Sequence, residues 1–387
     1  RTMGRWLDLF PKGSEKRRPG LLVAQSFQRL FNWDLAGMAP LLERAESLLK
    51  GPNCSTPEDR RQTLLGDIAV QRAVCLTWLP DPQNGLHHAR QALQLVPKNH
   101  RYAHTNAIAY AAACMLFCGE KDDALLVLDK ALTDDCAAGS LNAGHLLTTK
   151  AAIFSYTANW DAVEASAKSI LTIHKAVSQA DYWVGYAHFF LGSVAYERNQ
   201  LDSASEHFYA VEKLRYRVNT RVYHDALLGQ ALVAIAEANA KRLELYRAAA
   251  YSFAIETKDP FSKQMSDWFE VRRAISSGKI SPPPAPHQST DDSTRLWLIY
   301  PSLTQAEHLV HKGDQCACSE ALDCIEKGLQ MARFHHNFRL EIQYLAVKAV
   351  ALKCAGKRDQ ALEVLEQALR RAEPHGLVRS FVDRGSM

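Results

Sequence analysis

Hydrophobic residues recur every three or four positions through most of the chain, and short polar turns interrupt this period. In 336–373 two such stretches flank a turn at Gly356. The small or apolar positions that mark the pattern are Ala349 before the turn and Ala361, Leu365 and Ala368 after it. This spacing places one apolar stripe on each of two helices. The segment therefore predicts a pair of amphipathic helices that pack against each other.

The same paired pattern occurs in most of the remaining chain. The predicted complete pairs are 19–31 with 35–50, 57–79 with 81–96, 102–117 with 121–132, 146–157 with 160–174, 182–197 with 201–214, 222–238 with 243–256, and 296–312 with 317–333. A short helix near Trp6 is expected to end at Phe10, before Pro11. The chain is thus predicted to be helical from end to end.

The length of the repeat is nearly constant. Small or apolar residues near the start of the second helices are Gly85, Ala124, Val163, Ala204, Leu243, Ala321 and Ala361. Their spacings are 39, 39, 41, 39, 78 and 40 residues, so the double interval hides one repeat. Its first helix is predicted over 262–276. Its second helix would fall on the prolines between Pro282 and Pro286, which cannot continue a helix, and we expect a loop near 279–294.

This pattern resembles the helical hairpins of tetratricopeptide repeats, although about 40 residues exceed the usual ~34. The predicted fold class is all-α, a right-handed superhelix of about nine tetratricopeptide-like helical hairpins (an α-solenoid). One hairpin buries too little apolar surface to be stable, and stacking gives one continuous core. The superhelix is expected over 18–373, with a lead-in at 1–17 and a tail at 374–387.

Composition fits an ordinary folded protein, with 387 residues, 47% hydrophobic, 23% charged and a net charge of +4. The basic groups at 16–18 and at Arg215, Arg217 and Arg221 are interpreted as solvated helix ends, so no nucleic acid contact is expected. No apolar run approaches the ~20 residues of a membrane span, and no signal peptide is evident. We expect a cytoplasmic protein without a membrane partner, whose nine cysteines stay reduced.

The tail carries the most distinctive motif. Gly356–Ala372 is followed by Glu373, Pro374, Gly376, Val378, Arg379, Phe381, Asp383 and Gly385. This run resembles the A-E-P-x-G-x-V-R-x-F-x-D-x-G ending of the superhelical domain of MalT-type regulators, the large ATP-binding members of the LuxR group. The head is similar to the segment by which that domain leaves a winged-helix region, through Trp6, Leu7, Pro11, Arg18, Pro19, Leu21 and Leu22.

In that family the superhelical domain lies between an NTPase module and a DNA-binding helix-turn-helix. The chain has no G-x-x-x-x-G-K-[ST] loop, since Gly278 and Lys279 are followed by Ile280. We expect no cofactor in this segment, with ATP bound only by a missing N-terminal domain, and a tail that leads to a missing DNA-binding module. The resemblance implies inducer sensing, in which a small-molecule effector or a regulatory protein binds the superhelix and alters self-association.

Two kinds of chemistry find little support. The residues of the metal-like cluster are Cys316, Cys318, Cys324, His335 and His336. A C-x-C at a helix start differs from the C-x₂₋₄-C knuckles of zinc sites, so buried thiols and surface histidines are the preferred interpretation and no metal is expected. Gly192 and Ser193 lack the second half of G-x-S-x-G. We assign no catalytic residue and expect no enzyme.

Candidate ligand contacts lie on first helices, which line the concave face of tetratricopeptide arrays. Counting from Gly192, the residues expected to point inward are Tyr186, Phe189, Ser193 and Glu197, with Arg198 beside them. Such a set could stack on and hydrogen-bond a sugar or an aromatic effector. The alternative is that Tyr186 and Phe189 pack between helices. A second candidate rim consists of Arg217, Arg221, Tyr223 and His224, and candidate partner contacts near the C-terminal end are Arg339, Gln343 and Lys353.

Two functions remain open from the sequence. The first is an effector-sensing and interaction module of a MalT-like regulator. The second is a free-standing tetratricopeptide adaptor that binds only protein partners. A stabilising metabolite would favour the first, and retention of a protein without such a ligand would favour the second.

Overall fold

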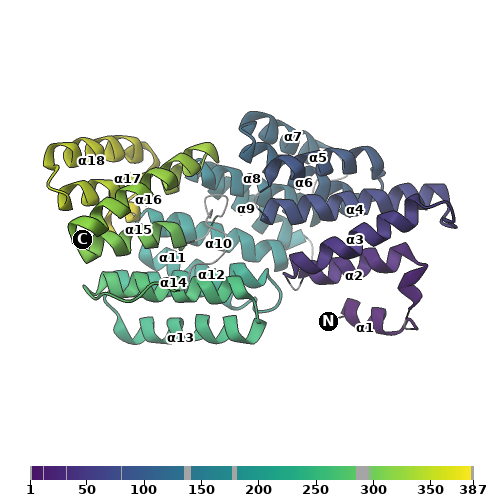
Figure 1. The fold of residues 1–387 in the computed structure, drawn as a ribbon, viewed down its shortest axis with the longest axis horizontal. Helices are drawn as coiled ribbons and strands as arrows, with labels where there is room; N and C mark the ends of the chain where they lie inside the picture. The colour runs from purple at the N-terminus through teal and green to yellow at the C-terminus, as the bar shows by residue number, and fades with distance from the viewer. Residues whose placement is uncertain are drawn as a thin grey trace. The chain divides into compact units, whose positions relative to one another are not determined.

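The computed structural model describes residues 2–11, 13–31, 33–79, 81–134, 141–176, 181–284, 296 and 298–384. Over these residues the chain is helical without β-strands, and consecutive helices pack on one another (Figure 1). The predicted all-α class is confirmed at this level, and the arrangement is consistent with an α-solenoid. The handedness of the superhelix and the count of nine hairpins stay predictions.

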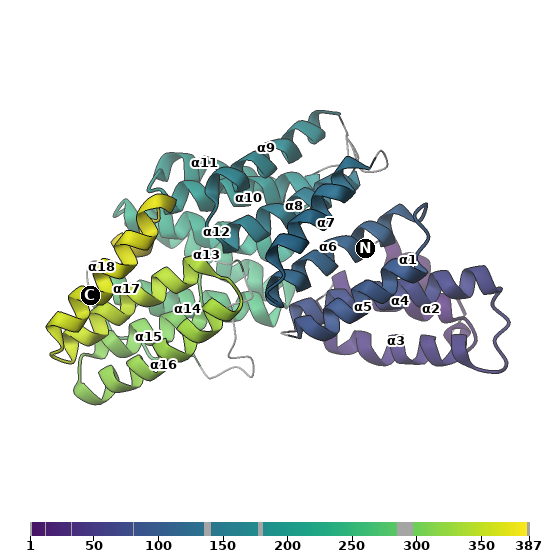
Figure 2. The same ribbon diagram turned by 90° about the horizontal axis from the view of Figure 1, so that it is seen from above.

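Most helices form antiparallel pairs, which Figures 1 and 2 show side by side. The pairs are α2 (Pro19–Phe31) with α3 (Leu35–Lys50), α4 (Glu58–Trp78) with α5 (Pro82–Leu95), α6 (Arg101–Phe117) with α7 (Lys121–Thr133), α10 (Asp181–Glu197) with α11 (Leu201–Glu212), α12 (Thr220–Ala236) with α13 (Ala240–Thr257), α15 (Pro301–Lys312) with α16 (Gln315–Phe334), and α17 (Phe338–Cys354) with α18 (Arg358–Ala372). Between α7 and α10 the chain forms α8 (Leu141–Tyr156) and α9 (Trp160–Ala176). The lead-in forms α1 (Thr2–Asp8) and a 3₁₀ turn, η1 (Ser14–Lys16).

One residue in the left-handed region marks most of the turns within pairs. These residues are Gly119, Ala158, Asn199, Ala238, Gly278 and Gly356, with φ between 52° and 87°. The first five follow one another at 39, 41, 39 and 40 residues, the interval predicted from the sequence. The second helix then begins two residues later, as at Lys121, Trp160, Leu201, Ala240 and Arg358. A recurring turn geometry therefore underlies the recurring sequence register.

The seventh hairpin breaks this rule. Its first helix is α14 (Pro260–Ser276), and Gly278 adopts the same left-handed conformation (φ 68°). No helix follows over the described residues 279–284, because the prolines from Pro282 to Pro284 lack the N–H groups that a helix would need. The predicted loop is confirmed over these six residues. The rest of the predicted loop, 285–294, lies outside the described residues.

Two predicted helix starts were wrong by five residues, and the first is that of α8, which begins at Leu141 and not at residue 146. The helix expected from Leu296 begins at Pro301, and Leu298–Tyr300 form a non-helical segment that is at most 2% exposed. The backbone N–H of Leu298 donates to the Asp225 carboxylate of α12, at 3.1 Å from Oδ2. The side chain of Leu298 also approaches Gly229 on α12. This buried segment packs on α12, which helical periodicity alone could not reveal.

Glycines permit close packing around α10. The fully buried ring of Phe208, on α11, lies against Gly192 of α10 and Gly229 of α12. A Cβ atom at either glycine would lie 2.7 Å from a carbon of this ring. Small residues at these positions let one aromatic side chain fill the space between two successive hairpins.

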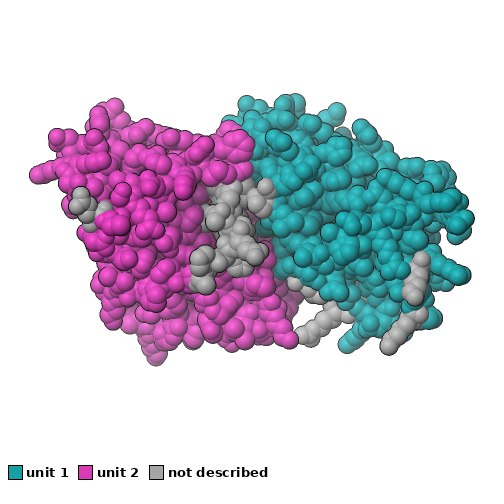
Figure 3. All heavy atoms as spheres, viewed as in Figure 1, with its two compact units in different colours: residues 1–149 teal, residues 150–387 magenta. Residues whose placement is uncertain are grey.

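The chain divides into two compact units, residues 1–149 and 150–387 (Figure 3). The boundary falls within α8. In unit 1, Leu22, Met38, Leu42, Leu49 and Ile68 form part of one buried cluster. The prediction of one continuous superhelix over 18–373 stays a prediction.

The residues after α18 fold back onto unit 2. A 3₁₀ turn, η2 (Glu373–His375), leads through Gly376 (φ 62°) to the short helix α19 (Arg379–Val382). We refer to residues 377–384 as the tail. The tail packs on α10 and α17, and Leu377, Arg379, Ser380 and Arg384 are buried. The last part of the sequence motif is thus a packed element of unit 2.

Candidate functional site

One face of α10 carries three of the nine residues predicted to bind a ligand. Tyr182, Tyr186, Ser193 and Glu197 lie at i, i+4, i+11 and i+15, a spacing that places them on one side of an α-helix. We call this side the α10 face. Its two halves have different surroundings.

The N-terminal half is aromatic. Tyr182, Trp183, Tyr186 and Phe190 form what we call the aromatic cluster, with ring centroids 4.8–6.4 Å apart between neighbours. The first three side chains are half-buried, and Phe190 is buried. Burial raises the pKa of Tyr182. Partly accessible rings with phenolic hydroxyl groups can stack on a flat ligand and hydrogen-bond its edge.

The second predicted rim meets this half of the α10 face. Arg217 Nη1 lies 2.9 Å from the carboxylate of Asp181, the first residue of α10. Asn219 caps α12 through its side-chain oxygen, and its amide nitrogen donates to Tyr182 Oη over 3.4 Å. The structure therefore brings the start of α10 and the start of α12 together, although the sequence separates them by almost forty residues.

The other members of that rim join helices. Arg221 makes a bidentate ion pair with Asp259 at 2.9 and 3.0 Å, and both side chains are largely buried. Tyr223 packs on Phe253 of α13 with a centroid distance of 4.6 Å. These contacts position α12 against its neighbours, and Tyr223 is only 6% exposed.

The contact between His224 and Ser266 resembles that between a general base and a serine nucleophile. His224 Nε2 lies 2.9 Å from Ser266 Oγ, and burial lowers the pKa of His224 to about 4. Both residues are nearly inaccessible, at 1% and 3% exposure. A substrate cannot reach this pair without opening the helix packing, so we interpret it as a hydrogen bond between α12 and α14.

Three residues predicted on or beside the α10 face have partners within the fold. Phe189 is 3% exposed and packs on Phe208, which is the alternative considered for it from the sequence. Ser193 Oγ donates to the carbonyl of Phe189 at 2.8 Å. Arg198 pairs with Asp161 and Glu164 of α9, so it links neighbouring hairpins.

The C-terminal half of the α10 face is ionic and covered by the tail. Arg339 Nε, on α17, donates to Glu197 Oε1 at 2.7 Å, and Ser380 Oγ donates to Glu197 Oε2 at 2.9 Å. The N–H of Val378 donates to the backbone carbonyl of Glu197 at 2.9 Å. Glu197, predicted to be available to a ligand, is therefore 1% exposed and fully engaged.

Further ion pairs fasten the end of the tail. Asp383 accepts a hydrogen bond from Tyr196 Oη at 2.8 Å and another from Arg272 Nη2 of α14 at 2.9 Å. Asp383 also pairs with Arg379. Arg384 Nε lies 2.9 Å from Glu307 Oε1 of α15. We call this set the ion network, formed by Glu197, Arg272, Glu307, Arg339, Arg379, Asp383 and Arg384.

At two of the buried arginines, neighbouring carboxylates outweigh the effect of burial on the pKa. Burial alone would lower the pKa of Arg272 and Arg339, but Asp383 and Glu197 respectively raise it. For Arg384 burial prevails and lowers the pKa. The network contains four guanidinium groups and three carboxylates. Asp225, whose pKa burial raises to about 7 while Arg339 opposes the shift, is a nearby fourth carboxyl group.

The cysteine and histidine candidates do not form a metal site. Over the described part of the chain, no group of three or more His, Cys, Asp or Glu side chains could hold a metal ion. Cys316 is exposed at the start of α16, whereas Cys318 is buried and His335 is 3% exposed. Of the predicted partner contacts, Gln343 donates to Ser380 of the tail at 3.4 Å, and Lys353 is exposed.

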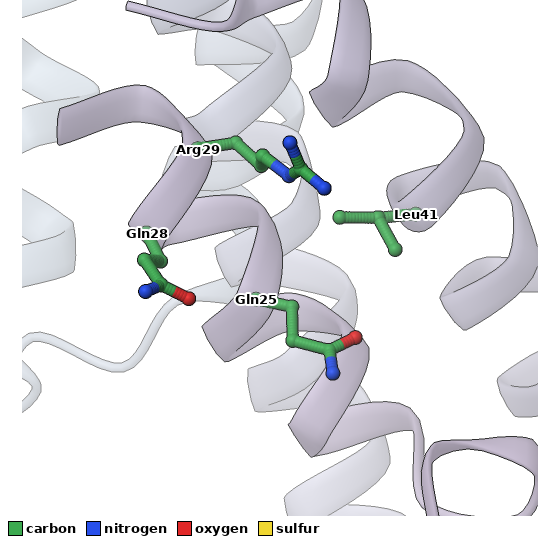
Figure 4. Close-up of a pocket in the computed structure, with 4 residues that line it drawn as sticks. All are labelled: Gln25, Gln28, Arg29 and Leu41. Carbon is green, nitrogen blue, oxygen red and sulfur yellow. The ribbon is translucent and has the colours of Figure 1, made fainter. Parts of the chain in front are cut away.

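Unit 1 contains a separate surface hollow. Figure 4 shows its lining residues, Gln25, Gln28 and Arg29 from α2 and Leu41 from α3. Arg29 pairs with Asp34 at 2.7 Å. Among the described helices, none is both long and apolar enough to span a bilayer.

Sequence reasoning missed several residues that shape the α10 face. Tyr182 lies one turn before Tyr186, so the helical period could have identified it. Arg272 and Glu307 carried no such signal, because they reach the tail only through tertiary packing.

Comparison with known proteins adds no identification. No protein-family model matches the chain, and no curated protein matches it at a significant level.

Proposed function

We propose that the chain is an effector-sensing and interaction module of a MalT-type regulator of the LuxR group, and that it acts without catalysis. A small-molecule inducer carrying a sugar or aromatic ring binds the aromatic cluster of α10. The alternative is an adaptor that binds only proteins.

The aromatic cluster is the observation that carries this proposal. Tyr182, Trp183 and Tyr186 are all half-buried on adjoining turns of one helix, and the amide of Asn219 contacts Tyr182. Partly exposed rings of this kind offer apolar faces for stacking, and nearby amide and hydroxyl groups fix the orientation of a ligand. Most other residues predicted to bind are already engaged with protein partners.

The tail supports the regulator part of the proposal. The resemblance to MalT-type regulators depends on Gly376, Arg379 and Asp383 among others, and these residues have defined roles in the fold. Gly376 adopts φ 62°, and Arg379 and Asp383 are paired within the ion network. A motif whose residues hold the last element against the repeat array is in keeping with a module that precedes another domain.

Protein binding is favoured by a different surface. Tyr209, Tyr216, Leu245 and Ile255 on and between α11 and α13 are 48%, 56%, 64% and 53% exposed. Tyrosine side chains are enriched among the residues that dominate protein interfaces. An adaptor that used this surface would not need the aromatic cluster.

Thermal unfolding with a panel of mono- and oligosaccharides, nucleosides and aromatic amino acids tests the proposal. A ligand at 100 times its Kd stabilises the native state by about 2.7 kcal/mol, which raises the unfolding temperature by several degrees. Replacing Tyr182 and Tyr186 with Ala should abolish this rise.

The matched control is Tyr251→Ala, an exposed tyrosine on α13 outside the cluster. It should leave the ligand-induced rise unchanged. A panel that gives no rise in the wild type, together with capture of a protein that requires Tyr209 and Tyr216, would establish the adaptor instead.

A further inference from the structure

The tail is bound to unit 2 with its polar side inward. Arg379, Ser380 and Arg384 are 7%, 0% and 4% exposed, whereas Val378 and Val382 are 39% and 54% exposed. Among the apolar residues of the tail, Leu377 is buried, with 3% of its surface exposed. Apolar collapse alone would place the valines inside. Phe381 is half-buried. Apolar burial therefore contributes at Leu377 and Phe381, and polar contacts account for the inward side chains of Arg379, Ser380 and Arg384.

The surface beneath the tail comes from four separate helices. Tyr196 and Glu197 belong to α10, Arg272 to α14, Glu307 to α15 and Arg339 to α17. We call these five residues the docking surface. Each makes a polar contact, directly with the tail or with a group that contacts it. The docking surface therefore matches the arginine, hydroxyl and aspartate groups of a short segment.

An ionic surface of this kind suits exchange of its occupant. A buried ion pair gains little net free energy over apolar packing, because desolvation offsets most of the attraction. When an ionic segment leaves, water can solvate both sets of charges. A segment held in this way is recognised by the pattern of its charged and polar groups.

We propose that the docking surface is a peptide-binding site that the chain's own tail fills, and that it accepts a segment of the tail's chemistry from a partner protein when the tail is withdrawn. The partner segment carries an arginine, a hydroxyl residue directly after it, and an aspartate followed by a second arginine four residues after the hydroxyl residue, as in 379–384. The inference concerns the C-terminal half of the α10 face and does not depend on ligand binding at the aromatic cluster.

The tethered tail suppresses binding of a free peptide in the wild type. A segment joined by a short linker has an effective concentration in the mM range. A free peptide at μM concentration competes poorly against it. Weakening the tail, while leaving the docking surface unchanged, should expose the site.

The test uses the full chain and a fluorescently labelled peptide, LVRSFVDR, which reproduces residues 377–384. Asp383→Ala with Arg384→Ala removes the tail's hydrogen bonds from Tyr196 and Arg272 and its ion pair with Glu307, and it alters none of these three residues. Fluorescence anisotropy should show this variant binding the peptide at least about tenfold more tightly than the wild type, because the internal competitor is weakened.

Two controls define specificity. Glu366→Ala with Arg370→Ala removes an exposed ion pair on α18 and should bind the peptide as weakly as the wild type does. A peptide with lysine in place of the aspartate should not bind the tail variant. If the double variant does not fold, the single variant Arg384→Gln weakens the tail less severely, and circular dichroism establishes its folding.

Two results would overturn the proposal. The first is equal peptide affinity for the wild type and for a folded tail variant. The second is no binding to a folded variant whose tail amides exchange rapidly with solvent, because the docking surface would then be free and still inert.

Discussion

The two halves of the α10 face share one helix and one periodicity, yet they have opposite characters. At the start of the helix Tyr182, Trp183 and Tyr186 are half-buried, and their rings contact one another edge-to-face or tilted. At its end Tyr196 and Glu197 are at most 2% exposed and bond to the tail. Helical spacing places the tyrosines and Glu197 on one face of α10. The tail, nearly two hundred residues away in the sequence, covers the C-terminal half of this face, so that half has a structural role. The aromatic half keeps partly accessible rings for a ligand.

The largest effect is expected at the ionic half. Arg339→Met should destabilise unit 2 by about 3–5 kcal/mol, because Glu197 would keep a buried charge without its guanidinium partner. Urea unfolding followed by circular dichroism measures this loss. Arg370→Met is the matched control, since Arg370 pairs with Glu366 at exposures of 78% and 63%. Arg370→Met should lower the free energy of unfolding by at most about 1 kcal/mol.

A comparable loss in both arginine variants would mean that burial of Glu197 does not distinguish the two ion pairs. The halves of the α10 face would then differ less than their geometry indicates.

A pH-dependent effect of intermediate size is expected at Asp225. Burial raises its pKa from 3.8 to about 7, so the folded state binds the proton more tightly than the unfolded state does. The wild type should therefore lose stability as pH rises from about 4 to about 7, by up to a few kcal/mol. Asp225→Asn has no charge to bury, and its side-chain oxygen can still accept the N–H of Leu298.

Urea midpoints of both proteins at pH 5 and pH 8 test this expectation. The Asn variant should gain stability relative to the wild type at pH 8 but not at pH 5. An equal difference at both pH values would contradict the raised pKa.

The sequence predicted the helices and the interval between their turns because both have local causes. Apolar periodicity defined the helices, and the interval of about forty residues matched the left-handed turns from Gly119 to Gly278. The prolines after Ser281 likewise have a local effect, because they lack the N–H groups that a helix needs. The buried segment Leu298–Tyr300 and the partners of Glu197 depend on long-range packing, which periodicity does not encode. For the same reason Phe189 and His224 were ligand candidates in the sequence but are core residues in the fold.

Gly192→Ala should lower the stability of both halves of the α10 face, by a smaller amount than Arg339→Met. The Cβ of the alanine would lie 2.7 Å from the ring of Phe208, which supports α10 from behind. Overpacking of this kind costs about 1–3 kcal/mol. Combining it with Phe208→Leu should recover part of the loss, measured by urea unfolding. Additive losses in the double variant would show that the ring is not the cause.

The smallest effect is expected in the aromatic half. Tyr186→Leu should cost only about 1 kcal/mol, because the side chain is half-buried and leucine retains part of the apolar contact. This loss should be smaller than that of Arg339→Met, because the two variants change the aromatic half and the ionic half of the α10 face respectively. A loss as large as that of Arg339→Met would identify Tyr186 as a structural residue and weaken its assignment to a ligand site.

Hydrogen exchange at the amide of Val378 tests the central claim most directly, because this N–H donates to the carbonyl of Glu197 at 2.9 Å. We expect protection in the wild type and exchange at least about tenfold faster in the variant with Asp383→Ala and Arg384→Ala, a change of about 1.4 kcal/mol in the opening free energy. Protection should be unchanged in the α18 control with Glu366→Ala and Arg370→Ala. Unprotected exchange in the wild type, or equal protection in the wild type and the tail variant, would contradict a tail held on α10 by the ion network.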